Sequence, residues 1–280
     1  MSTVTERVFE DRFVLFFDFL GSSEAAVHWP QARQYELVDL LRSIALNQSS
    51  EEISGQSQEN GSYSLSVMPE ITTFSDNIVA SWSGAQNEDI PELAMAAPFW
   101  TDIVCQEANR ILANVAEAAL RIGVLIRGGF SFGQMYHQDG AAFGEAMVDA
   151  VHLEGEIAHY PRVIVSDRII RLLTDPTPER CPWISRDPCD GLWHLNYIER
   201  MLKQAIPIED DTAAPNARLT PEGRERQEHL TSQVSRWKNA HLQRINHEHQ
   251  ALEHLGAINP AAKWAWFRER FATATARVPD

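Results

Sequence analysis

Cysteine is scarce in this chain of 280 residues, which contains only Cys105, Cys181 and Cys189. An odd number of cysteines without a CxxC spacing argues against a disulfide framework and against a zinc site. Long apolar runs are also missing, since no segment approaches the roughly 18 residues of a membrane span. The N-terminus, MSTVTERVFEDR, has no apolar core of signal-peptide length. We therefore expect a cytoplasmic protein with no membrane partner.

Positive charge is in short supply as well. The chain has 24 Lys and Arg against 39 Asp and Glu, a formal net charge of -15, and no basic run. This balance argues against electrostatic binding to nucleic acid. A substrate that carries phosphate would then need a metal ion and local hydrogen-bond donors. The remaining composition, with 44% hydrophobic residues, is that of an ordinary soluble globular protein.

Two aspartates stand where predicted buried strands end. Asp18 closes the apolar run FVLFFDFLG, and Asp76 lies inside ITTFSDNIVAS. A buried carboxylate must be paired, protonated or bound to metal, because an isolated buried charge is very costly. Two such groups brought together by strand pairing would form a site for a hard cation. The alternative for each is a capping or turn role.

The pattern of apolar residues gives an order of elements. It predicts strands at 12–19, 63–74, 78–82, 122–136, 162–166 and 192–198, and helices at 31–46, 91–120, 143–158, 167–173, 221–254 and from about 260. Pro98 would kink the helix at 91–120 or split off its first turns. The segment 176–191 is predicted to be loop.

The order β-α-β-β-α-β predicts an α+β protein with a ferredoxin-like, mainly antiparallel sheet and a C-terminal helical extension. We expect a catalytic domain at 1–205 and a helical extension at 206–280. A polar insertion at about 47–62 is expected to be a long loop or partly disordered.

Three motifs on these elements resemble one known family, the catalytic domain of class III nucleotide cyclases. FFDFLGSS at 16–23 is similar to the family pattern F-x-D-x-x-G-[FS]-[ST], and Asp76 corresponds to the family's hairpin aspartate. RGGFSFG at 127–133, followed by GEAMVDAVHLE at 144–154, is similar to the third motif. The resemblance covers roughly residues 10 to 170. Within the family, the chain looks most like the bacterial pyrimidine cyclases of antiphage Pycsar systems.

The resemblance implies a two-metal reaction at the interface of a homodimer. Two divalent cations, Mg²⁺ or Mn²⁺, would be held by Asp18, Asp76 and the backbone carbonyl of Phe19, and Arg127 would contact phosphate. The backbone N–H groups that would bind the β- and γ-phosphates belong to Leu20, Gly21, Ser22 and Ser23. The products would be a 3′,5′-cyclic nucleotide and pyrophosphate.

Departures from the family pattern bear on the substrate. Thr72 stands where purine-specific members have a lysine, and Ala141 where they have an acid, so the resemblance implies a pyrimidine base pocket. UTP, giving cyclic UMP as a second messenger in antiphage defence, is the preferred substrate, and CTP is next. Val148 and His152 replace the usual Asn and Arg, which raises the alternative of a non-catalytic module that binds nucleotide or dimerises. An adenylate cyclase with an unorthodox base pocket is the remaining alternative.

Overall fold

The computed structural model describes residues 9–46, 52–57, 61–84, 97–177, 179–205 and 221–276. The strands are β1 (Glu10–Leu20), β2 (Glu52–Ser57), β3 (Gly61–Ser66), β4 (Glu70–Phe74), β5 (Asn77–Ser83), β6 (Leu125–Gln138), β7 (Ala141–Gly144), β8 (Val163–Val165), β9 (Ile184–Arg186) and β10 (Trp193–Leu195). The helices are α1 (Ser22–His28), α2 (Gln31–Leu46), α3 (Ala97–Ile122), α4 (Glu145–His152), η2, a π-turn (Leu153–Ile157), α5 (Asp167–Leu172), α6 (Tyr197–Ala205), α7 (Pro221–His254) and α8 (Ile258–Ala274).

The main sheet has the strand order β4-β5-β1-β6-β8-β10-β9, and β7 pairs back onto β6. Each pair of neighbours among its first four strands is antiparallel, and β1 lies between β5 and β6. This order and direction are those of a ferredoxin-like β-α-β-β-α-β unit. Strand β8 joins β6 in parallel, and β10 and β9 continue the sheet. The predicted α+β class and ferredoxin-like arrangement are confirmed.

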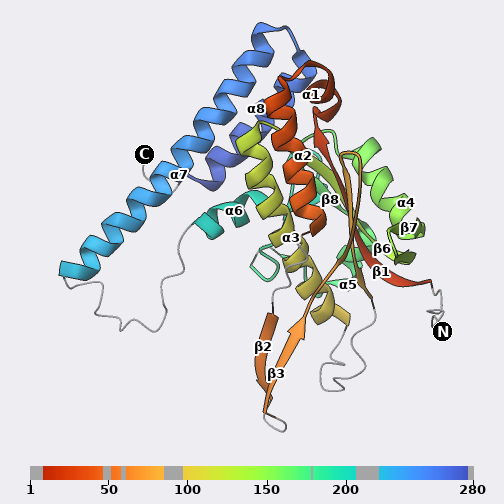
Figure 1. The fold of residues 1–280 in the computed structure, drawn as a ribbon. Helices are drawn as coiled ribbons and strands as arrows, with labels where there is room; N and C mark the ends of the chain where they lie inside the picture. The colour runs from red at the N-terminus through yellow and green to blue at the C-terminus, as the bar shows by residue number, and fades with distance from the viewer. Residues whose placement is uncertain are drawn as a thin grey trace.

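Strand β1 is buried on both of its faces. Phe13, Leu15 and Phe17 face the main core, while Val14 and Phe16 belong to a second apolar cluster. Helices α2 and α3 lie on one side of the sheet and α4 on the other (Figure 1). A central strand covered on both faces needs apolar residues at consecutive positions rather than at alternate ones. The continuous apolar run in the sequence has this physical cause.

Glycines in β6 allow helix α4 to lie directly on the sheet. A Cβ atom added to Gly129 would lie 2.2 Å from the carbonyl oxygen of Ala150 in α4. A Cβ atom added to Gly128 would lie 2.4 Å from the carbonyl oxygen of Phe16 in β1. A side chain at either position would therefore push neighbouring backbone away. The RGG sequence serves this close packing.

The C-terminal helices α7 and α8 pack on the main body. Ile245 of α7 and Phe267 and Phe271 of α8 are fully buried in the main core, beside α3 and α6. Trp264 is also buried, whereas Trp266 is half-buried and stacks on Tyr160 with ring centroids 5.7 Å apart. Figure 1 shows α7 and α8 running along the same side of the molecule as α3. The predicted boundary near 205 adjoins 206–220, which lie outside the described residues, and stays a prediction.

Five sequence predictions need correction. The insertion at 47–62 was expected to be loop, but 52–57 and 61–66 pair as β2 and β3. Backbone hydrogen bonds form this ladder, so an apolar alternation is not required for it. The remaining residues of the insertion, 47–51 and 58–60, lie outside the described part. Strand β9 was missed inside the predicted loop at 176–191, because a three-residue strand carries no readable period.

The other three corrections concern element boundaries. The strand expected at 63–74 is divided into β3, which pairs with β2 in a separate sheet, and β4, which joins the main sheet. The helix expected at 143–158 begins at Glu145, since Phe143 belongs to strand β7 and continues the helical spacing of apolar residues by chance. The strand expected at 192–198 ends at Leu195, because Tyr197 begins helix α6 and is buried by it. Helix α3 begins at Ala97, with Pro98 in its first turn, where a missing N–H costs little. The predicted first residues of that helix, 91–96, are not described.

Candidate active site

Asp18 lies two residues before the end of the central strand. Its neighbours across the sheet are Asn77 of β5 and Arg127 of β6. Because side chains alternate along a strand, Asp18 shares a face with Val14 and Phe16, the face that α4 covers. The carboxylate is 19% exposed, and its Oδ1 atom is buried without a hydrogen-bond partner. Burial raises the pKa of Asp18, and the nearby guanidinium of Arg127 opposes that rise.

Asp76 reaches the same place from the β4–β5 turn. It directly precedes Asn77, which is the register partner of Asp18. Ser75, with a left-handed φ of 57°, and Ser22 each donate a side-chain hydrogen bond to its carboxylate, Ser75 at 2.9 Å. The two carboxylates are close enough that the charge of Asp76 contributes to raising the pKa of Asp18. The structure thus brings together the two aspartates that the sequence singled out.

Arg127 lies between two acids. Its guanidinium is 3.3 Å from Oδ2 of Asp18 and forms a shorter ion pair with Glu154 of the π-turn η2. Glu154 is buried, and burial, followed by the charge of Asp18, raises its pKa to about 7. The π-turn places Glu154 beside Arg127, because it rotates residues after α4 relative to a continuing α-helix.

A second cation approaches this cluster from the C-terminal helices. Lys263 of α8 is half-buried, and its charge interacts with those of Arg127, Asp18 and Glu154. Burial, followed by the charge of Arg127, lowers the pKa of Lys263, while the two acids act in the opposite direction. No sequence signal pointed to Lys263. Its place depends on how α8 packs, and Trp266, one turn further along, stacks on Tyr160 in that packing.

The chain turns from β1 into α1 beside Asp76. Strand β1 ends at Leu20, Gly21 takes a left-handed φ of 90°, and α1 starts at Ser22. Ser22 and Ser23 line a hollow of about 490 Å³ together with Asp76. The side chains that close this hollow come from α1 and α2. Phe19 buries its ring in the core, so only its backbone is available to a ligand. Of the residues expected to bind phosphate and metal, Ser22, Ser23 and Asp76 thus line one hollow.

The expected base-pocket positions lie on other strands of the sheet. Thr72 is half-buried on β4, and Ala141 is exposed on β7. His137 of β6 is close to both positions. Its imidazole contacts the Thr72 hydroxyl, and it directly precedes Gln138, the register partner of Ala141. The structure does not bring Val148 and His152 into a buried site, since both are exposed on α4.

His137 is the centre of a buried polar chain that sequence reasoning missed. Its Nε2 atom is 2.9 Å from Oγ1 of Thr72, and its Nδ1 atom is 2.7 Å from Oγ of Ser81. Arg12 donates from Nε to the same Ser81 oxygen at 2.8 Å. Burial, with the charge of Arg12 second, lowers the pKa of His137 to about 4. The imidazole is therefore neutral at ordinary pH.

The low pKa of His137 predicts a pH-dependent stability. The unfolded chain binds a proton here below about pH 6.5, the folded chain only below about 4. The free energy of unfolding therefore falls as the pH is lowered through this window, by up to roughly 3 kcal/mol. We expect His137→Gln to flatten the pH dependence measured by urea denaturation between pH 4 and 6.5. The exposed His159→Gln is the matched control, and an unchanged slope for His137→Gln would contradict the prediction.

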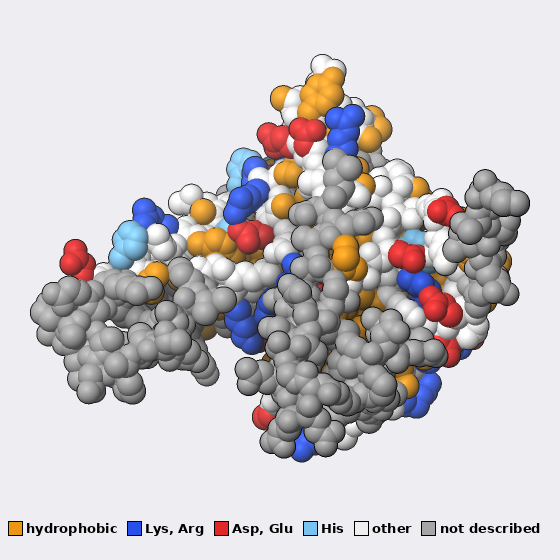
Figure 2. All heavy atoms as spheres, turned by 60° about the horizontal axis from the view of Figure 1, so that its bottom comes forward, with side chains coloured by type: hydrophobic (Ala, Val, Ile, Leu, Met, Phe, Trp, Pro, Cys, Tyr) orange, Lys and Arg blue, Asp and Glu red, His pale blue; other side chains and the backbone are white. Residues whose placement is uncertain are grey.

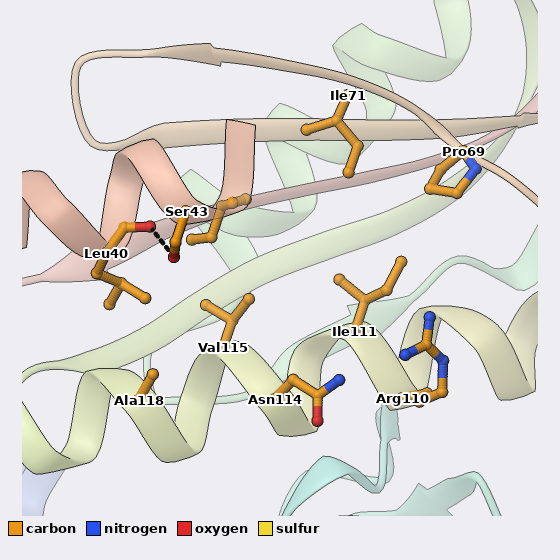
Figure 3. Close-up of a pocket in the computed structure, with 10 residues that line it drawn as sticks. Leu40, Ser43, Pro69, Ile71, Arg110, Ile111, Asn114, Val115 and Ala118 are labelled. Carbon is orange, nitrogen blue, oxygen red and sulfur yellow. Dashed lines mark hydrogen bonds between the residues drawn. The ribbon is translucent and has the colours of Figure 1, made fainter. Parts of the chain in front are cut away.

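A second hollow, of about 170 Å³, lies between α2, α3 and β4. Figure 3 shows Ile71 of β4 pointing toward Ile111 and Val115 of α3, with Leu40 of α2 beside them. Its basic residue, Arg110, is paired with Glu107. Neither Asp18 nor Asp76 lines this second hollow. On the outer surface, Figure 2 shows acidic and basic side chains interspersed on the coloured part of one face.

The acidic pair fits a divalent cation. Carboxylate oxygens are the preferred ligands of Mg²⁺ and Mn²⁺, and the unpartnered Oδ1 atom of Asp18 is available for one. Within the described ranges, no cluster of three or more His, Cys, Asp or Glu side chains suitable for a metal occurs. Substrate phosphates and water would have to complete the coordination shell, as they usually do for Mg²⁺. None of the helices in the described ranges is long and apolar enough to cross a membrane.

The chain is similar to a solved adenylyl cyclase. That structure is the adenylyl cyclase CyaB from P. aeruginosa, at 12% sequence identity and a TM-score of 0.36. The similarity covers 68% of this chain and 96% of that one. No protein-family model and no curated protein matches the sequence. At this identity and TM-score the function has to be argued from the geometry of the site itself.

Proposed function

We propose that this protein is a nucleotidyl cyclase that converts UTP to 3′,5′-cyclic UMP and pyrophosphate. The observation that carries the proposal is the convergence of Asp18 and Asp76 beside Arg127, at the rim of a hollow lined by Ser22 and Ser23. Paired acids with an adjacent arginine, cation-binding and phosphate-binding groups respectively, suit a polyphosphate and its metal ions.

The reaction forms one bond and breaks another. The ribose 3′-oxygen attacks the α-phosphorus, the bond from that phosphorus to the β-phosphate oxygen breaks, and the 3′-hydroxyl proton is released. Asp18, Asp76 and the Phe19 carbonyl would hold two divalent cations, Mg²⁺ or Mn²⁺. When bound, these cations lower the pKa of the 3′-hydroxyl and neutralise the charge on pyrophosphate.

The remaining work falls to the chain's own donors. Backbone N–H groups from Leu20 to Ser23 would bind the β- and γ-phosphates, in line with the turn at Gly21. Arg127 would turn its guanidinium from Asp18 to the phosphates and stabilise the charge that develops on them. Lys263 would add positive charge near Arg127, Asp18 and Glu154. Together they would replace the cation that His152, exposed on α4, cannot supply.

A homodimer completes the proposal. Helix α4 and strand β7 expose Phe143, Val148 and Val151, at 70%, 64% and 40% of their surface. Isolated exposed apolar residues are common, but a group on adjacent elements suits a contact with another chain. A second copy of this chain would cover these residues and bring base-binding residues to the partner's phosphates. The symmetric dimer would then have two equivalent active sites.

We expect Val148→Glu to weaken this dimer. A charge placed in an apolar contact would lose its hydration there, at a cost of a few kcal/mol, which is about 100-fold or more in the dissociation constant. Sedimentation velocity over a concentration series measures it, and cyclase activity should fall with the dimer. Leu255→Glu, at an 80% exposed residue after α7, is the control. A dimer unaffected by Val148→Glu would remove α4 from the proposed interface.

Product analysis tests the activity. The protein is incubated with UTP, CTP, ATP or GTP and Mn²⁺, and products are identified by mass spectrometry. Cyclic UMP as the main product is expected, with cyclic CMP next. Cyclic AMP alone would favour an adenylate cyclase. Nucleotide binding without any cyclic product would favour the non-catalytic module, which the valine at 148, unable to donate a hydrogen bond, supports.

The proposed biological role is a second messenger in antiphage defence. It rests on the resemblance to the Pycsar cyclases alone. Measuring cyclic UMP in phage-infected cells that express the protein tests it. A level that does not change on infection would speak against this role and leave the enzymatic proposal intact.

A further inference from the structure

The buried chain Arg12–Ser81–His137–Thr72 has a determinate direction of hydrogen bonding. Arg12 is permanently charged and can only donate, so Oγ of Ser81 accepts from its Nε atom. Ser81 is fully buried, and its own hydrogen needs an acceptor. The nitrogen Nδ1 of His137, 2.7 Å away, is that acceptor.

This direction assigns the tautomer of His137. With Nδ1 accepting, the neutral ring carries its hydrogen on Nε2. Nε2 then donates to Oγ1 of Thr72, 2.9 Å away. The opposite tautomer would leave the Ser81 hydroxyl hydrogen buried without a partner, which costs about 1–3 kcal/mol. The four side chains therefore donate in one direction, from Arg12 toward Thr72.

The chain ends on a hydroxyl with a spare hydrogen. Thr72 accepts from His137, and no acceptor for its own hydrogen occurs among the side chains that the structure describes. Thr72 is only half-buried on β4, so part of the residue is accessible from outside. His137 reaches it from β6, although β5 and β1 lie between β4 and β6 in the sheet. The end of β6 must curl over the sheet to make this contact.

We propose that His137 is a specificity-determining residue, which fixes the Thr72 hydroxyl as a donor to a carbonyl oxygen of the substrate base. This inference rests on the proposed function. Uracil offers O4 as an acceptor where cytosine has an amino group, which is a donor. The Thr72 oxygen already accepts a hydrogen bond from His137, so its hydroxyl hydrogen pairs better with a carbonyl oxygen than the hydroxyl does with a second N–H donor. The chemistry therefore selects UTP over CTP.

The tautomer is measured first, on the wild-type protein and without substrate. Nitrogen chemical shifts and long-range proton couplings of ¹⁵N-labelled His137, assigned by comparison with His137→Gln, distinguish Nε2–H from Nδ1–H. An Nε2–H ring at pH 7 is expected. An Nδ1–H ring or an imidazolium would overturn the proposal, whatever the enzyme does.

The specificity is measured as the ratio of kcat/KM for UTP to that for CTP. We expect a wild-type ratio of about tenfold or more, the worth of one hydrogen bond. Thr72→Val and His137→Leu should each bring the ratio to within about threefold of unity, whereas His137→Gln, which keeps an N–H donor, should retain part of it. Thr73→Val is the matched control, since Thr73 faces the other side of the same strand.

The outcomes separate this inference from the proposed function. A wild-type preference for CTP, or an unchanged ratio in both Thr72→Val and His137→Leu, would overturn the inference while cyclase activity stands. No cyclic product from any triphosphate would remove the proposed function and the base assignment with it. Thr72→Val replaces one half-buried hydroxyl with a methyl group, so it keeps the test valid if the His137 variants fold poorly.

Discussion

Asp18→Asn and Asp76→Asn are each expected to reduce Mn²⁺-dependent cyclic nucleotide formation about a thousandfold or more. Asparagine keeps the size of the side chain but removes the negative charge that would hold a divalent cation. Product formation is measured over a range of Mn²⁺ concentrations. Losing a carboxylate ligand should also raise the Mn²⁺ concentration needed for the half-maximal rate. Full metal-dependent activity in either variant would refute the two-metal assignment.

Stability measurements make this result interpretable. Asp18 is partly buried and its pKa is raised, so its negative charge does not stabilise the folded state. Asp18→Asn should therefore unfold at nearly the wild-type urea concentration, since Arg127 keeps Glu154 as its partner. Asp11→Asn, at an exposed residue of the same strand, is the matched control for activity and stability.

Arg127→Gln is expected to lose about 100-fold or more in kcat and also to destabilise the fold. Removing a group that stabilises the charge developing in the transition state typically lowers the rate by this factor. Without the guanidinium, Asp18 and Glu154 face each other in a partly buried site. Breaking an ion pair of this kind lowers the free energy of unfolding by roughly 2 to 4 kcal/mol, somewhat less than for a fully buried pair because water partly reaches the site. Urea denaturation and steady-state kinetics measure the two effects.

A double variant separates the two roles of Arg127. Adding Glu154→Gln removes one of the two facing acids, and most of the lost stability should return. The activity should not return, because the phosphates still lack their guanidinium. Arg121→Gln, at a 69% exposed side chain, controls for the loss of one positive charge. If the double variant recovered wild-type kcat, Arg127 would be a structural residue only.

Most of the sheet could be predicted from the sequence because its pattern is local. The apolar run at 12–19 encodes a strand covered on both faces, and the helices at 31–46 and 221–254 match α2 and α7. The hairpin around Asp76 follows from two β-branched runs about a polar turn. Elements failed where the local signal was weak, as at β9, or where polar residues pair through backbone atoms alone, as at β2 and β3.

The sequence by itself determined the ferredoxin-like arrangement and singled out Asp18, Asp76 and Thr72 as candidates, since each of these residues lies within a short stretch with a readable pattern. Only the tertiary structure decided the partners of these residues. The contact of Glu154 depends on a π-turn, that of Lys263 on the packing of a helix far along the chain, and that of His137 with Thr72 on two strands that are not neighbours in the sheet. Contacts between distant segments arise from the whole packing, because no local pattern records which side chains the fold will bring together.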